Sequence, residues 1–144
     1  MAARDLMVCN ADELALTTSW TTILMAKAAT NQRFRVKRWG VFFDSAALGA
    51  GVQAELIRVT TDGTMTSAAA VVIGLPGSET TQTTFYHTAT AEPTAGDVID
   101  VAEGAIDVIF PMGQEPIVPG AGRIAIRCKA DAAVNVRGKL IIEE

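Results

Sequence analysis

The sequence predicts an all-β protein, an antiparallel sandwich, jelly roll or barrel of about eight strands. Apolar and polar residues alternate with a period of two along most of the chain, and turn signals recur at intervals of roughly 8–12 residues. Runs that favour a helix are scarce beside these alternating stretches. At 144 residues, the chain has the size of one domain that can bury a core.

The N-terminal stretch is the hardest to assign. The run NADELALTTSWTTILMAKAA is the best helix candidate, because Asn10 or Asp12 can cap it and alanine and leucine favour helices. Its middle, TTSWTTIL, is rich in β-formers, which favours two short strands or an extended arm. We therefore predict that residues 1–31 form an N-terminal arm with the first short strand or strands, and that residues 32–144 form a single sandwich domain.

The alternation of apolar and polar residues shifts by one position between Val36 and Trp39. In RFRVK the apolar residues Phe34 and Val36 share one face, and in WGVFF the apolar set begins at Trp39, an odd number of positions later. We expect a bulge or a crossing between sheets near Lys37 and Arg38.

The middle of the chain continues with short β-rich runs. QAELIRVT is followed by Asp62 and Gly63, a dipeptide that predicts a hairpin turn, and TMTSAAAVVIGL can return from it. The later segments are a threonine-rich strand, TTQTTFYHTATA, two short strands, VIDVAEG and AIDVIFP, and a long loop, PMGQEPIVPGAG.

The last two runs alternate most clearly. RIAIRCK and VNVRGKLII each place apolar residues on one face and basic residues on the other, with ADAA as the turn between them. We interpret them as a closing hairpin whose apolar face fills the sandwich. The inward residues are Ile124, Ile126, Val134, Val136, Leu140 and Ile142.

Charge is segregated along the sequence. The net charge is −4, yet no lysine or arginine occurs from Val59 to Gly122, a stretch that holds many of the 16 acidic residues. We predict a protein–protein interface in which basic strand faces meet the acidic middle of the same chain or of a neighbour. The candidate interface residues are Arg123, Arg127, Lys129, Arg137 and Lys139 on the basic side, and Asp97, Asp100 and Asp107 on the acidic side.

Several classes of protein are disfavoured. No run approaches the roughly 18 apolar residues of a membrane span, and the start of the chain has acids and no long apolar core, so we expect synthesis in a cytoplasm and no membrane contact. No aromatic residue follows Phe110 and the pI is about 5.0, which argues against direct nucleic-acid binding. Cys9 and Cys128 are too few for a disulfide scaffold, and we expect two small buried hydrophobes, with a single bridge left open.

No catalytic motif emerges. His87 is the only histidine, which rules out a multi-histidine zinc site, and no serine or cysteine adjoins it. The acids between Asp97 and Asp107 lack the dense spacing of a calcium loop. The glycines of PGAGR lead into a strand, so this is a turn and not a phosphate loop. We expect no enzyme activity, no metal, no cofactor and no small-molecule substrate.

Four strings, in their order, resemble a family of tailed-bacteriophage virion proteins, the jelly-roll minor capsid proteins that decorate or cement the head. The strings are RWGVFFD, AELIRVTTDGTMT, TATAEPTAGDVID and PMGQEPIVPGAGRIAIRCKADAAVNVRGKLIIEE, and they cover most of the chain from Arg38 to Glu144. Residues 1–31 carry no part of the resemblance, and Cys128 departs from it.

The resemblance implies a jelly-roll sandwich that forms a homotrimer on the outer surface of an icosahedral phage head, where it clamps neighbouring major capsid subunits. It implies no catalytic residues, and a protein made in the host bacterial cytoplasm. One alternative is a receptor- or carbohydrate-binding jelly roll of a head fibre or tail, for which Trp20 is the candidate aromatic, since Trp39 is expected in the core. A cupin-like enzyme is disfavoured by the single histidine.

Overall fold

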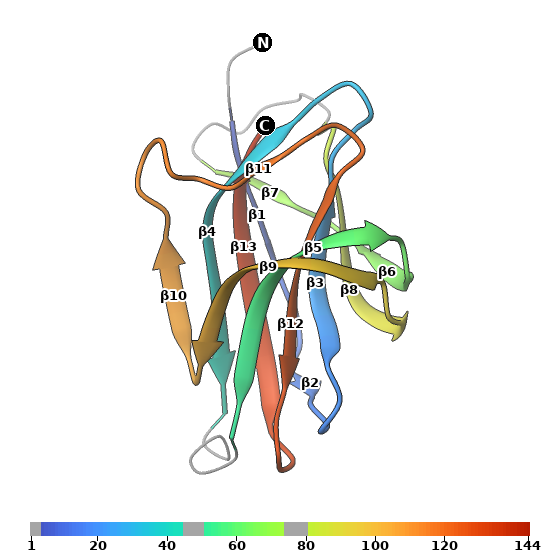
Figure 1. Cartoon of the computed structure of the whole chain (residues 1–144), viewed down its shortest axis with the longest axis vertical. Helices are drawn as coiled ribbons and strands as arrows, with labels where there is room; N and C mark the ends of the chain where they lie inside the picture. Colours follow the sequence, from blue (N-terminus) through green and yellow to red (C-terminus); the bar gives the residue numbers. More distant parts are fainter. Residues whose placement is uncertain (1–3, 45–50, 74–80) are drawn as a thin grey trace.

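The protein is an all-β sandwich, as predicted. The computed structural model describes residues 4–44, 51–73 and 81–144, and these residues form thirteen strands and no helix. The strands build two antiparallel sheets that stack face to face (Figure 1).

The two sheets have different strand orders. Sheet A runs β10 (Ile106–Ile109), β4 (Phe34–Phe43), β13 (Asn135–Glu143), β1 (Asp5–Cys9) and β7 (Val71–Ile73), with β11 (Ile117–Val118) paired to β4 and β2 (Leu14–Ala15) paired to β13. Sheet B runs β6 (Thr64–Ala68), β8 (Thr84–Ala91), β3 (Thr21–Lys27), β12 (Arg123–Lys129), β5 (Gln53–Thr61) and β9 (Thr94–Glu103).

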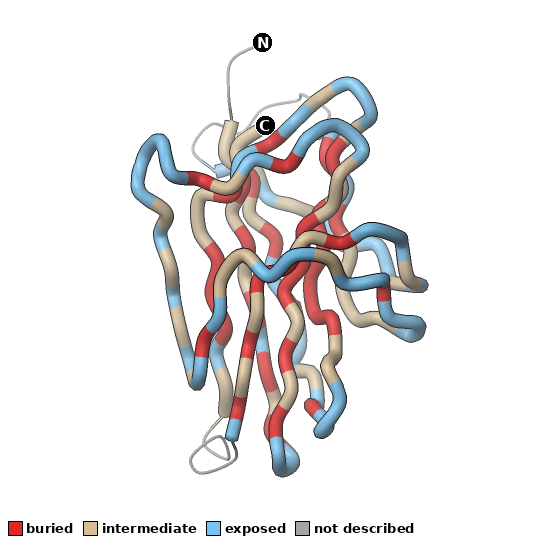
Figure 2. Tube along the Cα trace, in the orientation of Figure 1, coloured by how far each residue is buried: buried red, intermediate tan, exposed pale blue. Residues whose placement is uncertain are grey.

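The main core fills the space between the inner faces of the sheets (Figure 2). Each long strand sends alternate residues inward, which explains why the alternating runs form strands with one buried face. Trp39, predicted in the core, is fully buried there with Phe34 and Leu140. Burying each such large side chain contributes roughly 1.5–3 kcal/mol.

A second, smaller core lies on the other side of sheet B. Met25, Ile57, Val59 and Ala125 are buried there, and Met65 and Tyr86 pack against them. The side chains of Met65 on β6 and Tyr86 on β8 thus cover part of the outer face of the same sheet.

The N-terminal residues differ from the predicted arm. β1 pairs with β13 and β7 inside sheet A, and β3 lies between β8 and β12 inside sheet B. Residues 5–27 therefore belong to the body of the sandwich. The sequence pattern predicted a short strand or strands around TTSWTTIL, but it placed Asp5–Cys9 in the arm and gave no partners, because those partners lie far away in the chain.

The predicted bulge is confirmed. Opposite β4, Ile141 aligns with Arg38 and Ile142 aligns with Val36, so Lys37 is the extra residue. This is the position where the alternation of the sequence slips.

The predicted hairpin at Asp62 and Gly63 is wrong. β5 pairs with β12 and β9, whereas β6 pairs with β8. A side chain at Gly63 would lie 2.1 Å from the backbone oxygen of Ala91, so this turn packs against the loop before β9. The turn signal was correct, but it marks a corner between strands that do not pair.

The predicted closing hairpin is also wrong. β12 lies in sheet B, β13 lies in sheet A, and the two strands do not pair with each other. Their apolar faces both point into the core, as expected, but from opposite sides of it. Their polar faces therefore look outward in opposite directions.

Candidate functional site

The predicted basic surface is divided between the two outer faces of the sandwich. Arg123, Arg127 and Lys129 lie on the outer face of sheet B, and Arg137 and Lys139 lie on the outer face of sheet A. No single flat partner can contact both sets at once. The cause is the placement of β12 and β13 in different sheets.

Most of these basic residues have acidic partners within the chain. Arg127 lies 2.7 Å from Glu55, and the Lys139 ammonium lies 3.3 Å from Asp107, which also binds Arg38. Antiparallel pairing brings these acids next to the basic strands, so the charge segregation of the sequence is largely cancelled in space.

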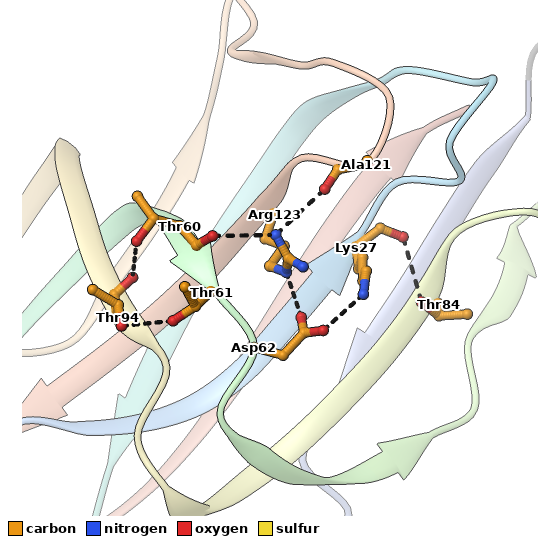
Figure 3. Close-up of polar contacts among 8 residues, drawn as sticks. All are labelled: Lys27, Thr60, Thr61, Asp62, Thr84, Thr94, Ala121 and Arg123. Carbon is orange, nitrogen blue, oxygen red and sulfur yellow. Dashed lines mark hydrogen bonds and ion pairs between the residues drawn. The ribbon is translucent and has the colours of Figure 1, made fainter.

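The best-connected cluster surrounds Asp62 (Figure 3). Its carboxylate accepts hydrogen bonds from Arg123 and from Lys27, the latter at 2.8 Å. These hydrogen bonds lower the pKa of Asp62 from 3.8 to about 2. Arg123 also approaches the backbone oxygens of Thr60 and Ala121, each at 3.5 Å (Figure 3). The cluster anchors the corner after β5 onto β12 and β3.

The three acidic candidates do not form one patch. Asp100 accepts a hydrogen bond of 3.0 Å from the indole nitrogen of Trp39 and so links the two sheets. Asp107 lies between Arg38 and Lys139 on the outside of sheet A. Asp97 lines a shallow hollow of about 250 Å³ between the ends of β5 and β9 and the loop before β12. Among the residues that the structure describes, no group of three or more histidine, cysteine or acidic side chains is placed to hold a metal ion.

Exposed apolar side chains gather on the outer face of sheet A. Strand register aligns five residues in one row, in the order Val71, Met7, Ile141, Arg38 and Ile109. Val71 is 60% exposed and Ile109 is 66% exposed. The neighbouring row is Ile73, Asp5, Glu143, Arg35 and Ile117. Alternation along the sequence does not reveal this row, because its members come from strands that are far apart in the chain.

Trp20 lies on the outer face of sheet B, at the start of β3. Its ring centroid is 4.6 Å from the Arg127 guanidinium carbon and 4.8 Å from the Lys129 ammonium nitrogen. Cation–π contacts of this kind hold the indole in place. Next to it is a hollow of about 260 Å³, lined also by Gln53, Glu55, Val101 and Glu103.

The single histidine lies in another hollow, of about 370 Å³, lined also by Cys9, Asn10 and Asp12. The Nδ1 atom of His87 is 2.9 Å from the hydroxyl of Thr88, a residue with a left-handed φ of 50° at a register shift in β8. This contact joins two consecutive residues of β8.

The two cysteines have opposite environments. Cys128 is fully buried, and burial raises the pKa of its thiol to about 12. Cys9 is exposed on the outside of sheet A, and both thiols are free. The expectation of two buried cysteines is therefore wrong for Cys9.

No family model, no curated protein and no solved structure matches this chain. Within residues 4–44, 51–73 and 81–144, the structure has no helix that is long and apolar enough to span a membrane.

Proposed function

We propose that this chain is a structural virion protein, which decorates the outer surface of an icosahedral phage head and bridges major capsid subunits. Its role is mechanical, without a catalytic step, a cofactor or a nucleic-acid ligand. The proposal joins the family resemblance of the sequence to two features of the sandwich.

The first feature is the order of strand pairing, which supports a jelly-roll assignment. Eight of the strands form the pattern, in chain order β1, β3, β4, β5, β9, β10, β12 and β13. They pair as β1–β13–β4–β10 in sheet A and as β3–β12–β5–β9 in sheet B. The first half of the set thus pairs with the second half in reverse order, as in a rolled-up hairpin. Jelly rolls of this kind occur in viral capsid and lectin domains.

The second feature, which carries the proposal, is a set of exposed apolar side chains on the outer face of sheet A. The outer face of a two-layer sandwich normally carries polar residues, because water covers it. Here Val71, Ile73, Ile109 and Ile117 are each more than 40% exposed on one face. These residues lie at the two edges of the sheet, on β7 and on β10 and β11, and exposed apolar surface of this kind is typical of sites where proteins contact other proteins. A protein that works by assembly requires such a surface.

The test is binding to phage heads that were assembled without this chain. Recombinant protein is mixed with such heads and sedimented, and heads that already carry the chain serve as the control. We expect saturable co-sedimentation with a fixed number of copies per empty head, and no further uptake by the control heads. Failure to sediment with heads of the phage that encodes the chain contradicts the proposal.

A second candidate function is carbohydrate binding, as in a head fibre or tail component. It is favoured by one observation, the hollow beside Trp20 with polar side chains from Gln53, Glu55 and Glu103. Sugar sites combine an aromatic ring with a few polar groups. Binding to a glycan array that is lost in Trp20→Ala supports this function, whereas an array without any signal removes it.

A further inference from the structure

Two short turns join the two flanks of sheet B across its outer face. β5 is the fifth strand of this sheet and β6 is the first, yet only Asp62 and Gly63 connect them. In the same way, Glu92 and Pro93 connect β8, the second strand, to β9, the sixth. Four strand spacings amount to about 19 Å in a flat sheet, whereas three Cα steps reach about 11 Å. Sheet B therefore curls until its flanks meet over β3 and β12, as β5 and β9 do in Figure 1.

Bulges allow these strands to bend. The pairing of β5 with β9 shifts register at three places between Leu56 and Thr61, and the pairing of β6 with β8 shifts at two places between Thr64 and Thr66. These shifts run from the middle of β5 to the middle of β6, on either side of the turn. A bulge leaves a residue unpaired and increases the local bend. The ladders beside the turns are therefore weaker than the unbroken ladder between β5 and β12.

The two turns form one connected unit. We call residues 60–64 and 91–94, which contain both turns, the strap. The hydroxyl groups of Thr61 and Thr94 are 2.6 Å apart and join its two halves. A side chain at Gly63 would lie 2.1 Å from a backbone oxygen of the second half, so the halves are also in direct contact.

Two carboxylates fasten the strap to the strands beneath it. Asp62 accepts hydrogen bonds from Arg123 on β12 and, at 2.8 Å, from Lys27 on β3 (Figure 3). Glu92 accepts a hydrogen bond from the backbone nitrogen of Thr22, near the other end of β3, at 3.0 and 3.1 Å to its two oxygens. Hydrogen bonds to charged groups are stronger than those between neutral groups. The closed position of the strap thus depends on two ionised side chains.

The strap adjoins the second, smaller core on the outer face of sheet B. Met65 follows the strap directly in the chain and packs against the cluster of Met25, Ile57, Val59 and Ala125. Met25 is only 2% exposed, although its side chain points away from the main core. An outward-facing position on a sheet is normally open to water. Release of the strap therefore removes part of the cover of Met25.

We infer that the strap is an acid-sensitive closure, which opens as a unit and uncovers the second core while the rest of the sandwich stays folded. Opening breaks the two carboxylate contacts and the bulged ladders, and it leaves the main core between the sheets intact. Local opening occurs where few apolar contacts and many exposed backbone hydrogen bonds hold a segment. The inference concerns sheet B alone and does not depend on the phage role.

Protonation of the carboxylates is the trigger. The hydrogen bonds from Arg123 and Lys27 lower the pKa of Asp62 to about 2. A lowered carboxyl pKa gives a contact that is complete above about pH 4 and is lost as the pH falls toward 2. Loss of this charge also leaves the two cations beside Asp62 without their counter-charge. The adjoining strand segments further carry Arg58 on β5, Asp97 on β9, and Tyr86 and His87 on β8.

Oxidation of methionine by hydrogen peroxide measures the opening, with mass spectrometry of peptides to assign the products. At neutral pH, Met112, which is 91% exposed, should oxidise rapidly and serve as the internal standard, whereas Met25 should be protected. Asp62→Asn and Glu92→Gln should each raise the oxidation rate of Met25, and the double variant should raise it at least about tenfold. Acidification of the parent from about pH 6 to about pH 2.5 should raise it by a similar factor, and the double variant should respond much less.

Matched variants separate local opening from unfolding. Asp107→Asn removes an ion-paired carboxylate from sheet A, and Glu103→Gln removes an exposed one from β9, so neither should change the oxidation rate of Met25. In a Cys9→Ser background, Cys128 of the main core should stay unreactive toward a thiol reagent in every variant at neutral pH. Protection of Met25 in the double variant, or exposure of Met25 only together with Cys128, overturns the inference.

Discussion

Asn10 is a buried polar residue that ties the two sheets together. Its side-chain amide donates a hydrogen bond of 3.0 Å to the backbone oxygen of Ile23 in β3, and its side-chain oxygen accepts one of 2.8 Å from the backbone nitrogen of Gly138 in β13. A side chain at Gly138 would lie 2.7 Å from the terminal methyl of Ile23, so glycine lets the sheets approach here without a shift of that side chain. The amide therefore satisfies one backbone group from each layer.

Replacing this amide should destabilise the sandwich. We expect Asn10→Ala to lower the free energy of unfolding by about 1–3 kcal/mol, because it leaves buried backbone groups without partners. Urea denaturation measures the change, with Asn31→Ala, at an exposed position, as the control. Equal free energies of unfolding for the two variants would show that the hydrogen bonds of the Asn10 side chain do not stabilise the protein.

The two thiols should differ in reactivity. Native protein is expected to react with one equivalent of an aromatic disulfide reagent, at the exposed Cys9, and unfolded protein with two equivalents. Burial keeps Cys128 protonated and inaccessible. Rapid reaction of both thiols in native protein, or of one thiol in native Cys9→Ser, would contradict this assignment.

Among the strands, β3 shows how a loop can complete a sheet. Its pairing with β8 covers only Leu24 to Lys27, so Thr22 has no partner strand on that side. The carboxylate of Glu92 accepts a hydrogen bond from the backbone nitrogen of Thr22, at 3.0 and 3.1 Å to its two oxygens. Glu92 lies in the short turn between β8 and β9, within the string AEPTAGD of the family resemblance, and this turn thus completes the hydrogen bonding of β3.

Ion pairs between strands should make stability depend on acidity. The pKa values of Asp62 and Asp107 are lowered to about 2, chiefly by hydrogen bonds from Arg123 and from Arg38 respectively. A lowered carboxyl pKa gives stability that is complete above about pH 4 and is lost as the pH falls toward 2. The effect should be modest, since the side chains are 44% and 32% exposed.

The melting temperature between pH 5 and pH 2 measures this dependence. We expect a progressive fall across that window, and a smaller fall in the double variant Asp62→Asn/Asp107→Asn. A double variant with the same acid profile as the parent would show that other groups determine it.

The strands themselves could be predicted from the sequence, but many of their partners could not. Alternation identified β4, β12 and β13, their inward faces and the bulge at Lys37. It could not show that β12 and β13 belong to different sheets, because a short turn joins strands of one sheet and strands of two sheets equally well. Alternation does not identify partner strands at Asp62 and Gly63 either, where the turn joins two strands that do not pair. For the same reason it could not predict that the exposed apolar residues of sheet A, which come from distant parts of the chain, share one face.

For the entire sandwich, the internal ion pairs change the expected response to salt. The charge pattern of the sequence suggests assembly through complementary acidic and basic patches. In the structure many of these charges already have partners, whereas exposed apolar residues occupy the outside of sheet A. The proposed attachment to phage heads should therefore weaken less than about tenfold between 0.1 M and about 1 M salt, although the Debye length falls from about 10 Å to about 3 Å. Sedimentation across this range measures it, and a loss of a hundredfold or more would show that charge dominates.

Imaging of purified particles tests the proposed role most directly. Particles of the phage that encodes this chain, and particles from which the gene has been deleted, are compared by electron cryomicroscopy. We predict density of the size of this sandwich on the outer surface of the head, at the junctions between capsid subunits, and its loss from the deletion particles. Identical heads in the two preparations, or density confined to the tail or to the interior, would contradict the account.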